Sequence, residues 1–85
     1  MTNRDPLTAP QVRAMIDDAG VDRNDLEIET DPEIWHDHRT GEDIQGVLIG
    51  HGPSRAAVIR VLQYNGLLIH PHDEHYSWVI NPPNR

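Results

Sequence analysis

The chain contains two stretches in which apolar residues recur at helical spacing. In the first stretch, Thr8 is a suitable N-cap, Pro10 is tolerated in the first turn, and Gly20 supplies a C-terminal stop. The apolar residues between these limits are Val12, Met15, Ile16 and Ala19. This spacing predicts a helix over about residues 9–19.

The second helical stretch lies between Ser54 and the pair Asn65 and Gly66. Ser54 is a suitable N-cap, and an Asn-Gly pair is a typical end of a helix. Four apolar residues share one face of the predicted helix, namely Ala57, Val58, Val61 and Leu62. The pattern therefore predicts an amphipathic helix that packs one side against a core.

Shorter segments have the pattern of β-strands. Residues 26–30 alternate apolar and acidic side chains, as a half-buried strand does, until Asp31 and Pro32 interrupt them. Residues 33–39 and 43–49 flank a turn-forming sequence that contains Thr40 and Gly41, and we predict that they pair as a hairpin.

Two further strands are predicted at residues 67–70 and 76–80, joined by a histidine-rich turn. The resulting order, helix, three strands, helix, two strands, is typical of an α+β fold. We predict two helices packed on a small antiparallel sheet. Because 85 residues are enough for only one domain, residues 1–85 are assigned to a single domain, with short flexible ends at 1–6 and 82–85.

A different fold follows if the segment from Gly41 to Gly50 is a short helix. The next helix would then be a recognition helix and residues 67–80 a wing, in the order that resembles a winged helix-turn-helix protein. The resemblance covers the C-terminal half and implies DNA binding through Arg55 and Arg60. Three residues favour the strand instead: Gly46 and the β-branched Val47 and Ile49.

The net charge of the chain favours some classes of binding partner over others. The formal net charge is −7, and all seven basic residues are arginine. Proteins that bind nucleic acid usually present a basic face, because counterion release from phosphates supplies much of the affinity. We therefore expect a protein partner with a basic surface rather than nucleic acid. No apolar run is long enough to cross a bilayer, so we expect no membrane partner and a cytoplasmic location.

No set of residues has the spacing of a catalytic site. The chain has no cysteine to supply a thiolate. Ser54 is expected to cap a helix, and Ser77 lacks the glycine-rich turn that presents a nucleophilic serine. The segment from Gly50 to Ser54 could bind an anion at a helix start, but it lacks the lysine of a P-loop. We expect a protein that is not an enzyme.

Acidic and aromatic residues along the strands are the candidates for a partner-binding surface. Tryptophan and tyrosine are preferred anchors of interfaces, and carboxylates complement a basic partner. The candidates are Glu27, Glu29, Asp31, Glu33, Trp35, Asp73, Glu74 and Tyr76. The predicted function is that of a small acidic protein-binding module, such as an accessory or inhibitor protein of a phage or mobile element. Association of two copies as a homodimer is a second option.

Five of the six histidines lie in two short clusters. Histidines one residue apart on a strand project from the same face, which is how strands present metal ligands. If the two clusters lay on neighbouring strands, they could bind zinc through His36, His38, His70 and His72, with His75 nearby. Our first expectation is instead that no cofactor is bound and that these imidazoles gain protons between about pH 7 and pH 5. Zinc is the alternative.

Overall fold

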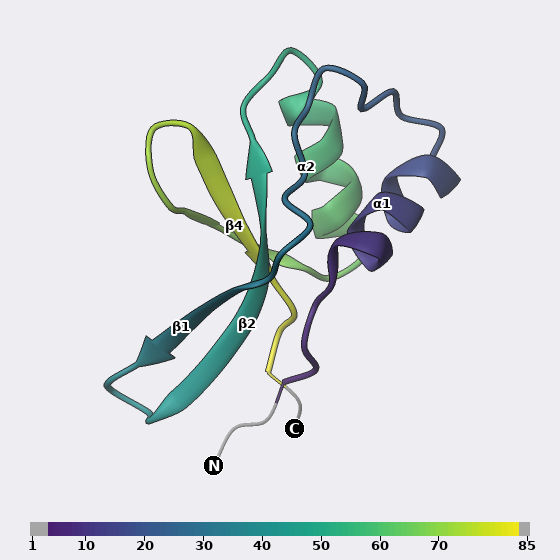
Figure 1. Ribbon diagram of the computed structural model, residues 1–85. Coiled ribbons are helices and arrows are strands. Elements are labelled where there is room, and N and C mark those ends of the chain that lie inside the picture. The colour runs from purple at the N-terminus through teal and green to yellow at the C-terminus, as the bar shows by residue number, and fades with distance from the viewer. Residues whose placement is uncertain (1–3, 84–85) are drawn as a thin grey trace.

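The computed structural model describes residues 4–83 and contains two helices and four strands (Figure 1). In chain order the elements are α1 (Ala9–Asp18), β1 (Glu33–Asp37), β2 (Glu42–Gly50), α2 (Arg55–Tyr64), β3 (Leu68–Pro71) and β4 (Tyr76–Ile80). The predicted α+β class is confirmed. The two helices and the last two strands begin and end within a few residues of their predicted bounds.

The strands form one antiparallel sheet in the order β1-β2-β4-β3, so that β1 and β3 are its edges. β1 pairs with β2 from Glu33 opposite Gly46 to Asp37 opposite Glu42, which confirms the predicted hairpin. Gly41 has a φ of +75° in its turn, a conformation that favours glycine. The winged-helix alternative is wrong, because β2 occupies the segment that would have to be helical.

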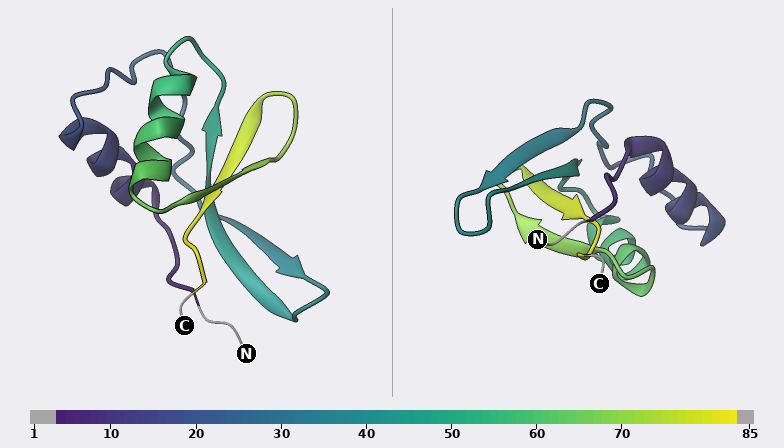
Figure 2. Two further views of the ribbon diagram at one scale, coloured as in Figure 1. Left: turned by 180° about the vertical axis from the view of Figure 1, so that it is seen from behind. Right: turned by 90° about the horizontal axis from the view of Figure 1, so that it is seen from below.

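Both helices pack on the same face of the sheet, as the two views of Figure 2 also show. Alternate residues of the central strands point toward the helices, because successive side chains of a strand face opposite sides. Val47, Ile49 and Val79 supply the sheet side of this core, and the helices contribute Val12, Ile16, Val58 and Leu62. All seven side chains are fully buried.

The opposite face of the sheet carries a smaller apolar cluster without a helix over it. Its members are Ile44, Trp78 and Ile80, with Leu48 packed against them. Trp78 pairs with Leu48 in register and is only 8% exposed. Burial of its large ring on the helix-free face is explained by Gly46, since the absence of a side chain there leaves room for the indole.

The predicted strand at residues 26–30 is not formed as a full strand. Its contact with the sheet is an isolated bridge between Ile28 and Ile49. Glu29 N donates to Leu48 O at 3.0 Å, and Gly50 N donates to Glu27 O at 2.7 Å. Ile28 lies opposite Ile49, and Glu33, where β1 begins, lies opposite Gly46. Residues 29–32 therefore span the same interval as only residues 47–48 of β2, so regular pairing is interrupted there. Pro32 has no N–H and adds no ladder hydrogen bond in this interval.

Ser54 occupies the N-cap position of α2, as predicted, but its side chain makes no hydrogen bond to the helix and binds Asp25 instead. The Ser54 backbone N–H donates to Asp25 at 3.0 Å, and the Ser54 hydroxyl donates to the other carboxylate oxygen. These bonds hold the pKa of Asp25 below its usual value of 3.8. In the segment considered as an anion site, the Ser54 backbone N–H thus binds a carboxylate of the same chain.

The two described ends of the chain meet. Arg4 donates to Glu42 at 3.1 Å and to the Asn81 carbonyl oxygen at 2.8 Å, and Asn81 donates back to Asp5 O at 2.9 Å. The flexibility expected at residues 1–6 and 82–85 stays a prediction, and residues 1–3 and 84–85 lie outside the described part.

The first test concerns Gly46. A Cβ at this position would lie 2.6 Å from the Val79 carbonyl oxygen and closer still to Trp78 Nε1. We expect Gly46→Ala to lower the free energy of unfolding by about 1–3 kcal/mol, as overpacking does, in urea titrations. In a Trp78→Leu background the cost should be smaller, because one of the clashing groups is removed. An unchanged unfolding free energy for Gly46→Ala would contradict the packing described here.

Candidate functional site

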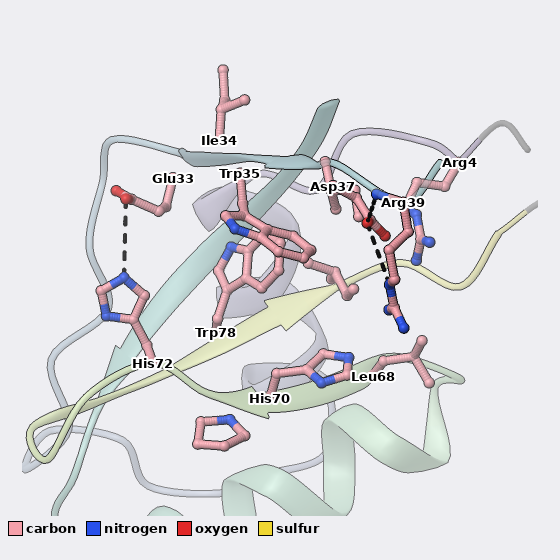
Figure 3. Close-up of a pocket in the computed structure, with 13 residues that line it drawn as sticks. Arg4, Glu33, Ile34, Trp35, Asp37, Arg39, Leu68, His70, His72 and Trp78 are labelled. Carbon is pink, nitrogen blue, oxygen red and sulfur yellow. Dashed lines mark hydrogen bonds and ion pairs between the residues drawn. The ribbon is translucent and has the colours of Figure 1, made fainter. Parts of the chain in front are cut away.

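The helix-free face of the sheet is hollowed into a groove of about 550 Å³, called the sheet groove below. Its walls come from both edge strands, β1 and β3, and its floor from Ile44 of β2 and from Trp78 and Ile80 of β4 (Figure 3). The period of the strands explains this composition. Residues two apart on a strand share a face, and the residues of the central strands that line the groove, Ile44, Trp78 and Ile80, are all apolar.

Two tryptophans form the centre of the groove. The rings of Trp35 and Trp78 meet edge to face, with centroids 5.8 Å apart and planes at 82° (Figure 3). Such pairs are stabilising beyond the area that they bury. The His70 ring lies 6.4 Å from Trp78 on the other side. Whereas Trp78 is buried, Trp35 is 48% exposed, so the groove presents a large aromatic surface to solvent.

The curl of the sheet brings its two edges toward each other at one end of the groove. His72 Nε2, directly after β3, lies 4.0 Å from Glu33 Oε1 of β1 (Figure 3). His72 Nδ1 lies 3.3 Å from Asp73. The Glu33 and His72 side chains therefore flank one end of the groove.

The other end of the groove holds two arginines, each beside a carboxylate. Asp37 accepts a hydrogen bond from Arg39 N at 3.0 Å, and Arg39 Nε lies 3.7 Å from the same carboxylate oxygen (Figure 3). Arg4 binds Glu42 with its Nε at 3.1 Å. The positive charges at this end are thus balanced locally.

Carboxylates dominate the end near Glu33. The Tyr76 hydroxyl donates to Glu27, and this bond, the partial burial of the phenol and the charges of Glu27 and Glu29 raise the pKa of Tyr76 to about 12. Asp73 accepts from His75 N at 2.7 Å and Tyr76 N at 2.8 Å, which fixes the β3–β4 turn and lowers the pKa of Asp73. We call six residues the acidic rim: Glu27, Glu29, Asp31, Glu33, Asp73 and Glu74.

No described arginine balances this charge. The arginine ion pairs within residues 4–83 join Arg4 to Glu42, Arg23 to Asp17 and Arg39 to Asp37, and none of them includes a residue of the acidic rim. The rim contacts of the described part are with Tyr76, with histidines and with backbone N–H groups. Glu74, for example, lies 3.7 Å from His75.

The structure brings several of the predicted partner-binding residues together. Tyr76 joins Glu27 and Glu29, and Glu33 and Trp35 project from the same face of β1. Asp73 accepts hydrogen bonds from backbone N–H groups of the β3–β4 turn. Asp31 is exposed. Sequence reasoning missed Trp78 as the centre of the site. The available signal was its position two residues after Tyr76, which puts both side chains on one face of β4.

The histidines do not form the four-imidazole arrangement. The two clusters lie on opposite edges of the sheet, and His36 projects from the face of β1 opposite to Trp35, where its Nδ1 lies 2.6 Å from Asp43 and its ring 4.9 Å from that of His38. His70 instead faces the groove. Within residues 4–83, no three histidine or carboxylate side chains are grouped as metal ligands. Zinc binding, including any at His75, is left to direct measurement.

Arg55 and Arg60 were predicted to bind DNA only in the winged-helix fold, which the structure does not have. Arg55 turns inward and donates to the Ser77 hydroxyl at 3.1 Å, and His51 Nε2 lies 3.2 Å from the same oxygen. Arg60 is exposed on α2. Ser77 itself is only 1% exposed. Its hydroxyl is therefore a buried partner of His51 and Arg55 and is not presented to solvent as a nucleophile.

The pKa of Tyr76 can be measured directly, because the chain has only one other tyrosine. In a Tyr64→Phe background, ultraviolet absorbance should show Tyr76 titrating near 12, and Glu27→Gln should move its pKa toward 10.0. Because the folded pKa is raised, this contribution to stability is complete below pH 10.0 and is lost as the pH rises through about 12. Titration at the ordinary value in folded protein would refute the contact.

Metal content is a separate test. We expect protein purified without a polyhistidine tag to contain no stoichiometric zinc and to melt at the same temperature with and without a chelator. One zinc per chain together with a lower melting temperature in chelator would establish the zinc alternative, since structural zinc contributes directly to folding. His36, His38, His70 and His72 would then be the first residues to mutate.

Comparison with known proteins gives no relative: no family model, no curated protein and no solved structure matches this chain. Neither α1 nor α2, the helices of the described residues, is long and apolar enough to cross a membrane. The function of the sheet groove must therefore be argued from its own residues and their charges.

Proposed function

We propose that this chain is a small acidic protein-binding module, without enzymatic activity, that binds a basic surface of a partner protein through the sheet groove. The observation that carries the proposal is an exposed aromatic groove whose acidic end forms no ion pair with an arginine of residues 4–83. Partner binding would cover the helix-free face and place cations beside the acidic rim.

The character of the groove supports a protein partner. Interface centres are enriched in tryptophan and tyrosine, and their borders are polar. Trp35 and Trp78 occupy the centre here, Glu33 of the acidic rim lies at one end, and the paired Arg39 and Arg4 lie at the other. The groove is open to solvent along an edge strand, so a polypeptide could enter without displacing a helix.

The charge supports a basic partner. A net charge of −7 attracts cationic surfaces at long range, and complementary charges at the border of an interface mainly raise the association rate. Nucleic acid would be repelled by the same field. A role as an accessory or inhibitor protein of a phage or mobile element, acting in the cytoplasm on a nucleic-acid-binding protein, is the biological form of this proposal.

The test compares two sets of charge reversals with the same net charge. Asp31→Arg with Glu33→Arg changes the acidic rim, and Asp18→Arg with Asp22→Arg is the matched control away from the groove. With immobilised protein and host lysate, we expect a basic partner to be captured by wild type and by the control pair, and lost with the rim pair. Capture by wild type should weaken as salt is added, because salt screens exposed charges.

A second pair of variants tests the aromatic centre. Trp35→Ala should reduce capture at least about tenfold if the exposed indole is an interface anchor, and Tyr64→Ala, which removes an exposed ring on α2, should not. Thermal melts establish first that each variant is folded. Equal capture by the rim pair, the control pair and Trp35→Ala would refute the proposed function.

A further inference from the structure

We propose that the acidic end of the sheet groove is a binding site for an arginine side chain of the partner, held between the Trp35 ring and the Glu33 carboxylate, and that protonated His72 competes for the same carboxylate. This inference rests on the proposed function, because it names the chemical group that the groove recognises.

The first support is the arrangement along β1. Glu33, Trp35 and Asp37 are spaced by two residues and face the groove together, so the indole is flanked by a carboxylate on each side. Asp37 already has the Arg39 guanidinium of the same chain beside it, at 3.7 Å. Glu33, in the equivalent position on the other side of Trp35, forms no ion pair with an arginine of residues 4–83. Among the described residues, one of two similar positions is therefore filled and the other is open.

The second support is the exposure of the two groups that would contact the arginine. Trp35 is 48% exposed, and the Glu33 side chain is also 48% exposed. The His72 nitrogen is 4.0 Å from Glu33, which is too far for a hydrogen bond, so both carboxylate oxygens can accept bonds from a ligand. A cation over an indole face gains about 0.5–1 kcal/mol at exposed sites, and a carboxylate beside it adds a charge-assisted hydrogen bond.

Arginine fits this pair better than lysine. Its planar guanidinium can stack on the indole while its N–H groups bind a carboxylate in bidentate fashion, whereas the lysine ammonium is a compact, strongly hydrated charge. Asp73 contacts His72, which lies beside Glu33, and Tyr76 joins Asp73 to Glu27, so the charges of these carboxylates favour a cation at this end.

His72 gives the site a dependence on pH. The groups that face His72 are Glu33 of β1 and Asp73 of the β3–β4 turn. His70 of β3, Asp37 of β1, Arg39 and Arg4 are the other charged or titratable groups that line the groove. In its protonated form the His72 imidazole is attracted to Glu33 and repels an incoming guanidinium, so acidification weakens arginine binding.

The chain carries its own reporter for this site. Its only two tryptophans are Trp35 and Trp78, and both line the groove. Tryptophan fluorescence is therefore titrated with blocked Gly-Arg-Gly, with the lysine peptide, and with the citrulline peptide, which keeps the shape of arginine without its charge. We expect saturable binding of the arginine peptide, weaker binding of the lysine peptide, and none of the citrulline peptide.

Two variants identify the carboxylate. Glu33→Gln keeps the shape of the side chain and should weaken arginine binding about fivefold or more, the effect of losing one charge-assisted contact of about 1 kcal/mol. Glu74→Gln removes the same charge from the same rim, away from Trp35, and should change binding little. If the two variants have equal effects, binding follows overall charge, and the site between Glu33 and Trp35 is wrong.

The pH arm uses His72→Gln. Wild type should bind the arginine peptide several-fold more weakly at pH 5.5 than at pH 7.5, and His72→Gln should lose most of that dependence while its affinity at pH 7.5 stays close to wild type. His36→Gln, on the other face of β1, is the control and should keep the full dependence. An identical pH profile for wild type and His72→Gln would overturn the competition.

The outcomes separate this inference from the proposed function. If the arginine peptide does not bind, or the citrulline peptide binds equally well, while capture of a protein partner still depends on Trp35 and the rim, the arginine site is wrong and the protein-binding function stands. If both fail, both are wrong. If sedimentation shows a dimer that Trp35→Ala dissociates, the groove is occupied by a second copy, and a site for a different partner's arginine is refuted.

Discussion

The fit of the Trp78 indole over Gly46 is the contact on which the helix-free face depends. Without a side chain at Gly46, the ring can lie against β2, and it then supports Trp35 from one side and His70 from the other. The indole Nε1 is buried there and has no acceptor within the described residues. That cost, of the order of 1–3 kcal/mol for an unpaired buried donor, is offset by the apolar area that the ring buries.

The two faces of the sheet have different roles: one forms the core with the helices, and the other forms the sheet groove. The face under the helices buries aliphatic side chains completely and supplies the stability of a chain that is short for an independent domain. The other face keeps Trp35 and Glu33 accessible. Because one strand alternates between the two faces, β2 and β4 serve both tasks with neighbouring residues, such as Ser77 in the core and Trp78 in the groove.

The sequence predicts the elements well because they follow from local periodicity. The turn glycine and the β-branched residues favoured the hairpin correctly, and Gly46 correctly counted against a helix there. The predicted length of the strand at residues 26–30 was wrong, because only Ile28 bridges to the sheet. Ser54 was right as the N-cap position of α2, but its bonds to Asp25 join segments far apart in the sequence, which no local pattern contains. The groove was equally hidden, because the approach of Glu33 to His72 arises from the curl of the whole sheet.

The hydrogen bonds between Asp25 and Ser54 also connect the first half of the chain to the second. Asp25 precedes Ser54 by 29 residues, and the loop that carries it continues directly into Glu27 and Glu29. A contact of this span closes a long loop, so its formation carries the entropic cost of that closure. Asp25 binds the start of α2 and Glu27, two residues later, accepts from Tyr76 of β4. One short segment thus joins the helix layer to the acidic rim.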